Sequence, residues 1–236
     1  MRPRDTSPEA WKTYVELERR MPPAQRARQA LQLAALFRPG GAMNPILQAL
    51  RLLAAALDRL EIRYAIGGSF ASSARGARRF TEDLDLVARI RPEQTAELAE
   101  ALGKDWIADP NAIRRAIESA RSFNLIYIPS VQKFDIFPAV TPFHLVQLSR
   151  ADELPLEDSP DAEAFPVTTA EDVVLGILQW YRAGGEVSER QWSDITGVLL
   201  KTPEADLAYL RQWAERLEVA DLLEHALRDA ASDQPL

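Results

Sequence analysis

Two groups of residues in the first half of the chain have types and spacings suited to phosphate and metal chemistry. The first is Gly67-Gly68-Ser69 and the second is Asp83-Leu84-Asp85, with thirteen residues between Ser69 and Asp83. Glycines leave backbone N–H groups accessible to a phosphate, especially where a helix begins. Side chains alternate along a strand, so Asp83 and Asp85 share a face, and a divalent cation between them would relieve their repulsion. The spacing leaves room for a short helix and a return strand that bring both groups together.

A third aspartate, Asp135, lies in the middle of an apolar run that we expect to be a strand. An unpaired charge at such a position would be costly, so it needs a partner. A salt bridge to Lys133, which shares its face, or to an arginine is the structural explanation. A metal site shared with Asp83 and Asp85 is the functional one. Each feature alone is weak, but together they favour a nucleotide–metal site.

The hydrophobic pattern predicts the elements that would position these residues. From Pro45, apolar residues recur at three- and four-residue steps, which is typical of a helix with one buried stripe. Further predicted elements are strands at 62–66 and 81–87, helices at 92–103 and 111–120, and a hairpin of strands at 123–128 and 131–137. Together they predict an α+β fold, with a small mixed sheet flanked by helices and followed by an all-helical C-terminal domain.

The same pattern predicts four segments. Residues 1–42 form a helical N-terminal appendage, because Arg38 to Ala42 break any helix before Met43, which is itself a hypothetical native start. Residues 43–151 form the domain that carries these candidate site residues, and 152–167 are an acidic, proline-bearing linker. Residues 168–236 form the helical domain, where Thr168 with Glu171 and Ser188 with Gln191 resemble capping boxes.

The composition excludes several classes of function. A net charge of -7 argues against an extended, non-specific nucleic-acid surface, although a local basic patch is compatible with RNA. The absence of cysteine excludes disulfides and thiolate metal sites, and the two distant histidines argue against a catalytic triad or a zinc site. No apolar run approaches the roughly 20 residues of a membrane span, and no signal peptide is evident. We therefore expect a soluble, cytoplasmic protein with no membrane partner.

One combination of motifs resembles a known superfamily. Gly67-Gly68-Ser69, Gly76-x-x-Arg79-x-Thr81-x-Asp83-Leu84-Asp85 and Asp135 resemble the polymerase-β-like nucleotidyltransferases, and most of all the abortive-infection toxin-type nucleotidyltransferases of bacteria. Segments 169–175, 188–195, 209–214 and 219–223 also look like that group, and the resemblance implies that residues 43–151 are the catalytic domain. The resemblance runs from Met43 to Ala230.

The resemblance implies a role for each motif residue. Asp83, Asp85 and Asp135 would hold two Mg²⁺ ions, with Mn²⁺ as the alternative, and Asp135 would also orient or deprotonate the attacking hydroxyl. The residues that would bind the nucleotide are Gly67, Gly68, Ser69, Arg79, Thr81, Lys133, Arg190 and Asp194. The alternative for Arg79 is a solvated arginine in a basic loop. The alternative for Thr81 is a strand residue that orients this loop.

The helical half leaves two questions open. Arg190 and Asp194 lie four residues apart, so they form an exposed helical ion pair unless they face a nucleotide cleft, as the resemblance implies. Relatives often carry a lysine where this chain has Gly176-Ile177, which keeps a degenerate enzyme among the alternatives. Lys133 would compensate for the missing cation because it shares the face of Asp135.

The resemblance implies a Mg²⁺-dependent enzyme that moves a nucleoside monophosphate from an NTP to a hydroxyl of an RNA (tRNA-like) or protein acceptor. The implied setting is a toxin–antitoxin or phage-defence system with a cognate antitoxin. One alternative is a small-molecule (antibiotic) adenylyltransferase. The other is a non-catalytic nucleotide-binding or interaction module of the same fold.

Overall fold

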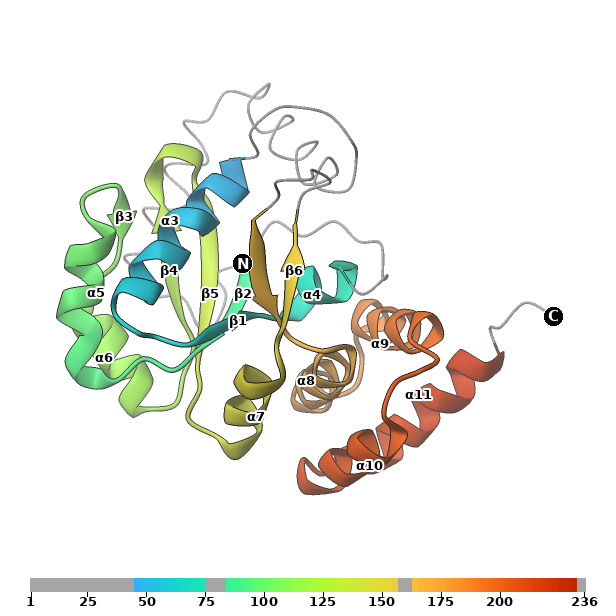
Figure 1. The fold of residues 1–236 in the computed structure, drawn as a ribbon. Coiled ribbons are helices and arrows are strands. Elements are labelled where there is room, and N and C mark those ends of the chain that lie inside the picture. The colour runs from blue at the N-terminus through green and yellow to red at the C-terminus, as the bar shows by residue number, and fades with distance from the viewer. Residues whose placement is uncertain (1–44, 75–83, 157–162, 233–236) are drawn as a thin grey trace.

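The computed structural model describes residues 45–74, 84–156 and 163–232 (Figure 1). The predicted appendage at 1–42 and the hypothetical start at Met43 lie outside the described residues, as do Arg79, Thr81 and Asp83. Ser69 is described as part of helix α4 (Gly68–Ala74), but its side chain is not.

A seven-stranded mixed sheet forms the centre of the described chain (Figure 1). Its strand order is β3-β4-β5-β2-β1-β7-β6, in which β2 with β5 and β1 with β7 are parallel pairs. The strands are β1 Tyr64–Ile66, β2 Leu84–Ala88, β3 Trp106–Ile107, β4 Phe123–Tyr127, β5 Gln132–Pro138, β6 Asp152–Pro155 and β7 Ala164–Val167. The sheet and the helices around it confirm the predicted α+β fold class.

The remaining regular structure is helical. The other α-helices are α3 Pro45–Arg59, α5 Thr95–Leu102, α6 Pro110–Glu118, α7 Pro142–Arg150, α8 Ala170–Ala183, α9 Glu189–Lys201, α10 Leu207–Arg216 and α11 Ala220–Ser232. Two short 3-10 turns are η1 Pro92–Gln94 and η2 Ile128–Ser130. No helix within these described stretches has the length and apolar character needed to cross a membrane.

Alternation along the strands gives the sheet two different faces. Leu84 and Leu86 of β2, with Phe134 and Ile136 of β5, are at most 1% exposed and lie in the main core with residues of α3, α5 and α6. On the opposite face, a small cluster packs against Leu148 of α7. The residues of β2 and β5 that alternate with these core residues therefore lie on the face of the sheet that packs against α7.

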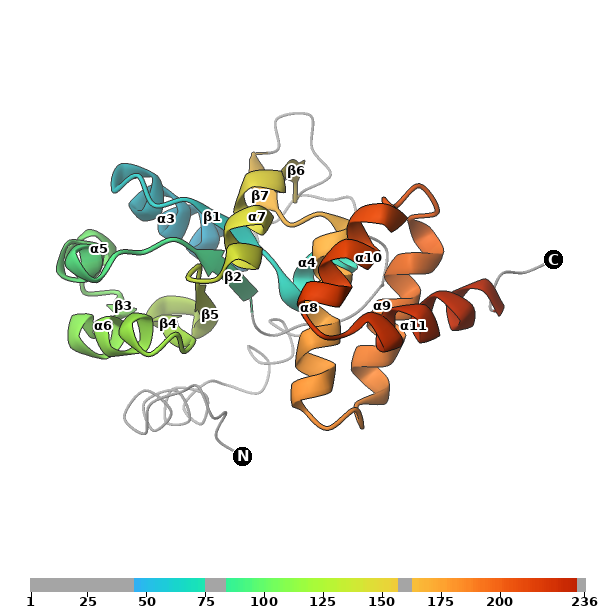
Figure 2. The same ribbon diagram turned by 90° about the horizontal axis from the view of Figure 1, so that it is seen from below.

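The C-terminal helices lie beside the sheet and α4 (Figure 2). Helix α4 contacts β2 as well as α8 and α9, so it connects the sheet to the helical part. Ser188 caps α9 by accepting a hydrogen bond from Gln191 N–H, as predicted. The predicted cap of α8 is displaced by one residue, because Thr169 rather than Thr168 accepts the hydrogen bond from Asp172 N–H.

The predicted linker at 152–167 contains two strands. β6 and β7 form an antiparallel hairpin, and β7 joins β1 through the pair Ile66 and Val167. Phe165 and Val167 are buried, which anchors the hairpin to the core. The acidic, proline-bearing composition suggested a linker, but charged residues and prolines are also typical of the edge of a sheet, which is where β6 lies. The wider division into domains stays a prediction.

Candidate functional site

Three polar residues form a row across neighbouring strands. Asn124 of β4 lies opposite Asp135 of β5, and Asp135 lies opposite Asp85 of β2. Directly paired residues place their side chains on the same face of a sheet. Asp135 is only 7% exposed, and Asp85 is half-buried. The fold therefore brings together two of the three aspartates of the predicted metal site.

Asp135 has a hydrogen-bonding or charged partner at each carboxylate oxygen. The ammonium of Lys133 lies 2.9 Å from Oδ2, and the side-chain amide of Asn124 donates a hydrogen bond to Oδ1. Both side chains of the ion pair are largely buried, and the opposite charge of Lys133 offsets part of the cost of burying this carboxylate. The structural explanation foreseen from the sequence is thus present, and the burial of Asp135 alone does not require a metal.

The glycine turn lies directly against Asp85. The N–H of Gly67 donates to the backbone oxygen of Asp85 at 2.8 Å. Gly68 has a φ of +56°, and a Cβ added to it would lie 1.8 Å from Asp85 Oδ2. Only glycine combines this backbone conformation with so close an approach. The turn and the carboxylate are therefore in contact, although their residues lie far apart in the sequence.

The donor set of this site suits a hard divalent cation. Asp85 and Asp135 present carboxylate oxygens from adjacent parallel strands, and such oxygens are the ligands that Mg²⁺ and Mn²⁺ prefer. Within the described ranges, no group of three His, Cys, Asp or Glu residues is close enough to hold a metal ion. The third carboxylate expected from the sequence is Asp83, which lies outside those ranges.

Helix α9 carries the two predicted nucleotide-binding residues of the helical part. Arg190 is exposed, whereas Asp194 is 6% exposed. Because α9 contacts α4, it lies near the helix that begins at the glycine turn. Ile177 of α8, one of the two residues at the place where the resemblance led us to expect a lysine, is buried in the main apolar core.

An aromatic pair borders the same face of the sheet as Asp135. Phe137 lies two residues after Asp135 on β5, and the ring of Trp180 on α8 meets it edge-on at a centroid distance of 5.5 Å. Trp180 is 55% exposed, whereas the neighbouring Tyr181 packs against Trp192. Of these two aromatic residues of α8, Trp180 is therefore the more accessible to a ligand.

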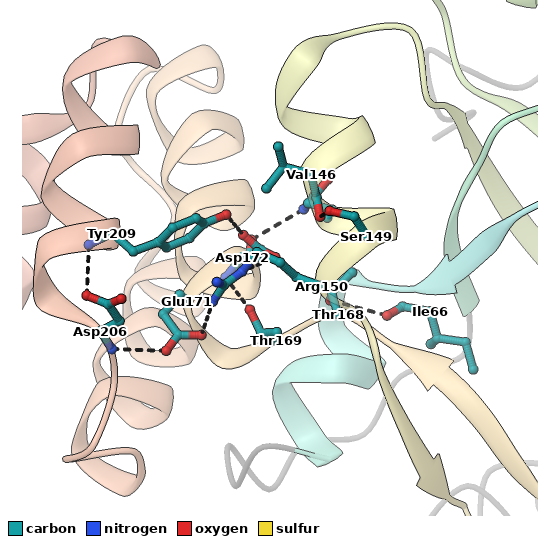
Figure 3. Close-up of polar contacts among 11 residues, drawn as sticks. Ile66, Val146, Ser149, Arg150, Thr168, Thr169, Glu171, Asp172, Asp206 and Tyr209 are labelled. Atoms are coloured by element: carbon teal, nitrogen blue, oxygen red, sulfur yellow. Dashed lines mark hydrogen bonds and ion pairs between the residues drawn. The ribbon is translucent and has the colours of Figure 1, made fainter.

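A buried polar network joins α7, α8 and α10 (Figure 3). Asp172 is 0% exposed, its Oδ1 accepts a hydrogen bond from the Tyr209 hydroxyl at 2.5 Å, and its Oδ2 lies 3.6 Å from Arg150 Nε. The Arg150 guanidinium also lies over the Tyr209 ring, 3.9 Å from its centroid. The network therefore connects a helix before the β6–β7 hairpin to two helices after it.

Two adjacent carboxyls in this network have opposite pKa shifts. Burial raises the pKa of Asp172, although Tyr209, Arg150 and Thr169 favour its ionised form. Burial acts in the same direction on the pKa of Glu171, but hydrogen bonds, first of all from the N–H of Asp206, outweigh it and lower that pKa. Burial and the hydrogen bond to Asp172 both raise the pKa of Tyr209.

Thr168, next to the residue that caps α8, contacts the strand that leads into the glycine turn. Both the N–H and the hydroxyl of Thr168 donate to the backbone oxygen of Ile66, at 2.9 and 3.2 Å (Figure 3). Ile66 directly precedes Gly67, and Thr168 directly precedes the residue that caps α8. The start of the C-terminal helices is thus hydrogen-bonded to the strand that leads into the turn.

Sequence reasoning missed Asn124 and the Asp172 network. Asn124 had a usable signal, since it is a polar residue within the apolar run of β4, as Asp135 is in β5. Asp172 had no local signal, because Arg150 and Tyr209 reach it from other helices.

Comparison with known proteins does not show which family the chain belongs to. No protein-family model matches the sequence, and no curated protein matches it. The antibiotic-resistance factor ANT(2'')-Ia in solution is a similar solved structure, with a TM-score of 0.44 and 18% identity over 76% of this chain and 95% of that chain.

Two other solved structures show comparable or weaker similarity. An antigenic nucleotidyltransferase-like protein from Paracoccidioides brasiliensis has a TM-score of 0.44 and 18% identity over 76% of this chain and 91% of that chain. A CCA-adding enzyme with ATP has a TM-score of 0.35 and 12% identity over 79% of this chain and 50% of that chain. At these scores and identities, the similarities do not establish a family for this chain.

Proposed function

We propose that the chain is a Mg²⁺-dependent nucleotidyltransferase that moves a nucleoside monophosphate from an NTP to a hydroxyl of an RNA or protein acceptor. The observation that carries the proposal is the contact of the Gly68 turn with Asp85, whose register partner is Asp135. A glycine turn in direct contact with one of a pair of carboxylates suits a metal-bound triphosphate.

Each group of residues has a role in this reaction. Asp85 and Asp135, with Asp83, would hold the metal ions, which would supply positive charge to neutralise the triphosphate. Gly67, Gly68 and Ser69 bind its outer phosphates. Arg79, Lys133, Arg190 and Asp194 contact the nucleotide, and Thr81 orients the loop that carries Arg79.

The bond changes follow from an in-line displacement. The acceptor hydroxyl oxygen forms a bond to the α-phosphorus. At the same time the bond between the α-phosphorus and the α–β bridging oxygen breaks, and pyrophosphate leaves with that oxygen. Asp135 orients the hydroxyl and accepts its proton, which then passes to solvent. For this step Asp135 has to exchange or share its contact with Lys133, whose ammonium lies 2.9 Å from Oδ2.

We place this activity in the cytoplasm. The proposed role is that of the toxin in a toxin–antitoxin or phage-defence system with a cognate antitoxin. The alternative role is that of an enzyme that adenylylates a small molecule such as an antibiotic. A non-catalytic module that only binds nucleotide is the second candidate. It is favoured by the buried ion pair of Lys133 and Asp135 and by the apolar Ile177.

The test offers each α-labelled NTP with Mg²⁺, cellular RNA and cellular protein to the full chain. We expect the wild type to label one acceptor class and to release pyrophosphate, and Asp83→Ala and Asp85→Ala to label none. Asp105→Ala, which removes an exposed carboxylate before β3, is the matched control and should label normally. If wild type binds nucleotide in calorimetry but labels nothing, the non-catalytic module is correct.

A further inference from the structure

Asn124 makes a direct contact with the proposed metal site. It lies opposite Asp135 in the antiparallel pair of β4 and β5, and its amide nitrogen donates to Asp135 Oδ1. Lys133 lies against the other oxygen, Oδ2. Because the two contacts approach different oxygens of one carboxylate, they fix the plane of that carboxylate as well as its position.

The other end of the Asn124 amide has no comparable contact. Its oxygen Oδ1 is buried, and no hydrogen-bond donor among the described residues reaches it. A buried acceptor without a donor destabilises a fold, and an apolar side chain of similar size would avoid that cost. A donor that arrives with the substrate, such as a water molecule, would satisfy this oxygen.

The charge of Asp135 also determines how the Asn124 amide is oriented. With its nitrogen toward the carboxylate, Asn124 donates a charge-assisted hydrogen bond. With the amide turned over, two oxygens would face each other and repel. The ionised form of Asp135, which is the form that binds a metal, is therefore the one that Asn124 stabilises.

We propose that Asn124 is a positioning residue for Asp135: it holds the carboxylate in the orientation in which it shares a divalent cation with Asp85. This inference rests on the proposed function, because it assigns Asn124 to the same metal site. Partners that orient metal ligands contribute to metal affinity, and their loss typically weakens it by about 10- to 100-fold.

The test measures Mn²⁺ binding to the full chain without nucleotide, from the electron paramagnetic resonance signal of free Mn²⁺. Asn124→Leu keeps a side chain branched at Cγ but removes the donor, and Asn124→Ser keeps a polar side chain that is too short to reach Asp135. Each should weaken Mn²⁺ binding by about 10- to 100-fold. Asp135→Ala is the reference for loss of the ligand itself. Gln147→Leu removes another buried amide, on α7, and should leave Mn²⁺ affinity within about 2-fold of wild type.

The outcomes separate this inference from the proposed function. If wild type and Gln147→Leu bind Mn²⁺ and both Asn124 variants bind it as tightly, Asn124 does not position Asp135 and the inference alone is wrong. If wild type binds no Mn²⁺, the metal site and the inference are both wrong. If circular dichroism shows both Asn124 variants unfolded, the role of Asn124 is structural and the inference is wrong.

Discussion

Gly68 and Asp85 are in such close contact that a single added carbon atom would separate them. A Cβ on Gly68 would lie 1.8 Å from Asp85 Oδ2 and 2.6 Å from its Cγ, far inside van der Waals distance. Any other residue at position 68 must move either the turn or the carboxylate. Because Asp85 is paired with Asp135 on the next strand, such a movement would disturb the whole proposed site.

We expect Gly68→Ala to reduce nucleotide transfer by about 100-fold, because small displacements of reacting groups have effects of this size. It should also lower the free energy of unfolding by about 1–3 kcal/mol through backbone strain. Gly103→Ala is the matched control, since Gly103 also has a positive φ, +75°, but its added Cβ meets no atom within 4 Å. Transfer assays and urea denaturation measure both effects. Equal activity losses in the two variants would contradict the proposed role of the Gly68 contact.

We expect Lys133→Met to lower the free energy of unfolding in the absence of metal by about 3–5 kcal/mol, because it removes the ammonium from a largely buried ion pair. Mg²⁺ should then stabilise the variant more than it stabilises wild type, since the cation replaces the lost positive charge. Urea denaturation with and without Mg²⁺ measures this. Lys104→Met, at an exposed position, is the control. The prediction fails if Mg²⁺ has the same effect on Lys133→Met as on wild type.

We expect Tyr209→Phe to lower the free energy of unfolding by about 1–3 kcal/mol, because the buried Asp172 loses its hydrogen bond from the hydroxyl. Tyr181→Phe, also in the helical part, should change it by less than about 0.5 kcal/mol. Chemical denaturation of both variants checks the difference. Similar small changes in the two would show that the Asp172 network contributes little.

Asp172→Asn and Glu171→Gln should respond to pH in opposite directions. The raised pKa of Asp172 means that its ionisation costs stability, and this cost appears as the pH rises from the ordinary carboxyl pKa of about 4 through the raised value. Asp172→Asn should therefore gain stability relative to wild type as the pH rises from about 4 to 7.

The lowered pKa of Glu171 has the reverse effect. Its ionised form adds stability that is fully present above the ordinary pKa of about 4.3 and is lost as the pH falls through the lowered value. Glu171→Gln should therefore lose stability relative to wild type as the pH rises from about 3 to 5. Urea denaturation over a pH series measures both variants, and parallel trends would contradict the assigned shifts.

The sequence was most informative where a pattern repeats locally. Alternation in β5 predicted that Lys133 and Asp135 share a face, and the structure has their charged groups in contact. The hairpin of β4 and β5 and the cap at Ser188 were also local signals, and both are present. Such features depend on residues within a few positions of each other, so a single sequence contains them.

Features that depend on distant partners were harder to predict. The pairing of Asp85 with Asp135 requires β2 and β5 to be neighbours, and the strand order is set by packing of the whole sheet. Helix α7 has no counterpart among the predicted elements, although Thr141 caps it by accepting a hydrogen bond from His144 N–H. The β6–β7 hairpin resembled a linker because the charged residues and the proline of β6 lie at a sheet edge.

The position of the Asp172 network has a consequence for how the polypeptide is held together. Arg150 lies upstream of the β6–β7 hairpin, whereas Asp172 and Tyr209 lie downstream, and β7 is separately paired with β1. The base of the hairpin is thus fastened by contacts that do not depend on the peptide bonds at its far end. A protein cleaved between Pro155 and Ala164 should therefore remain one particle, because β6 stays paired with β7 and β7 stays paired with β1.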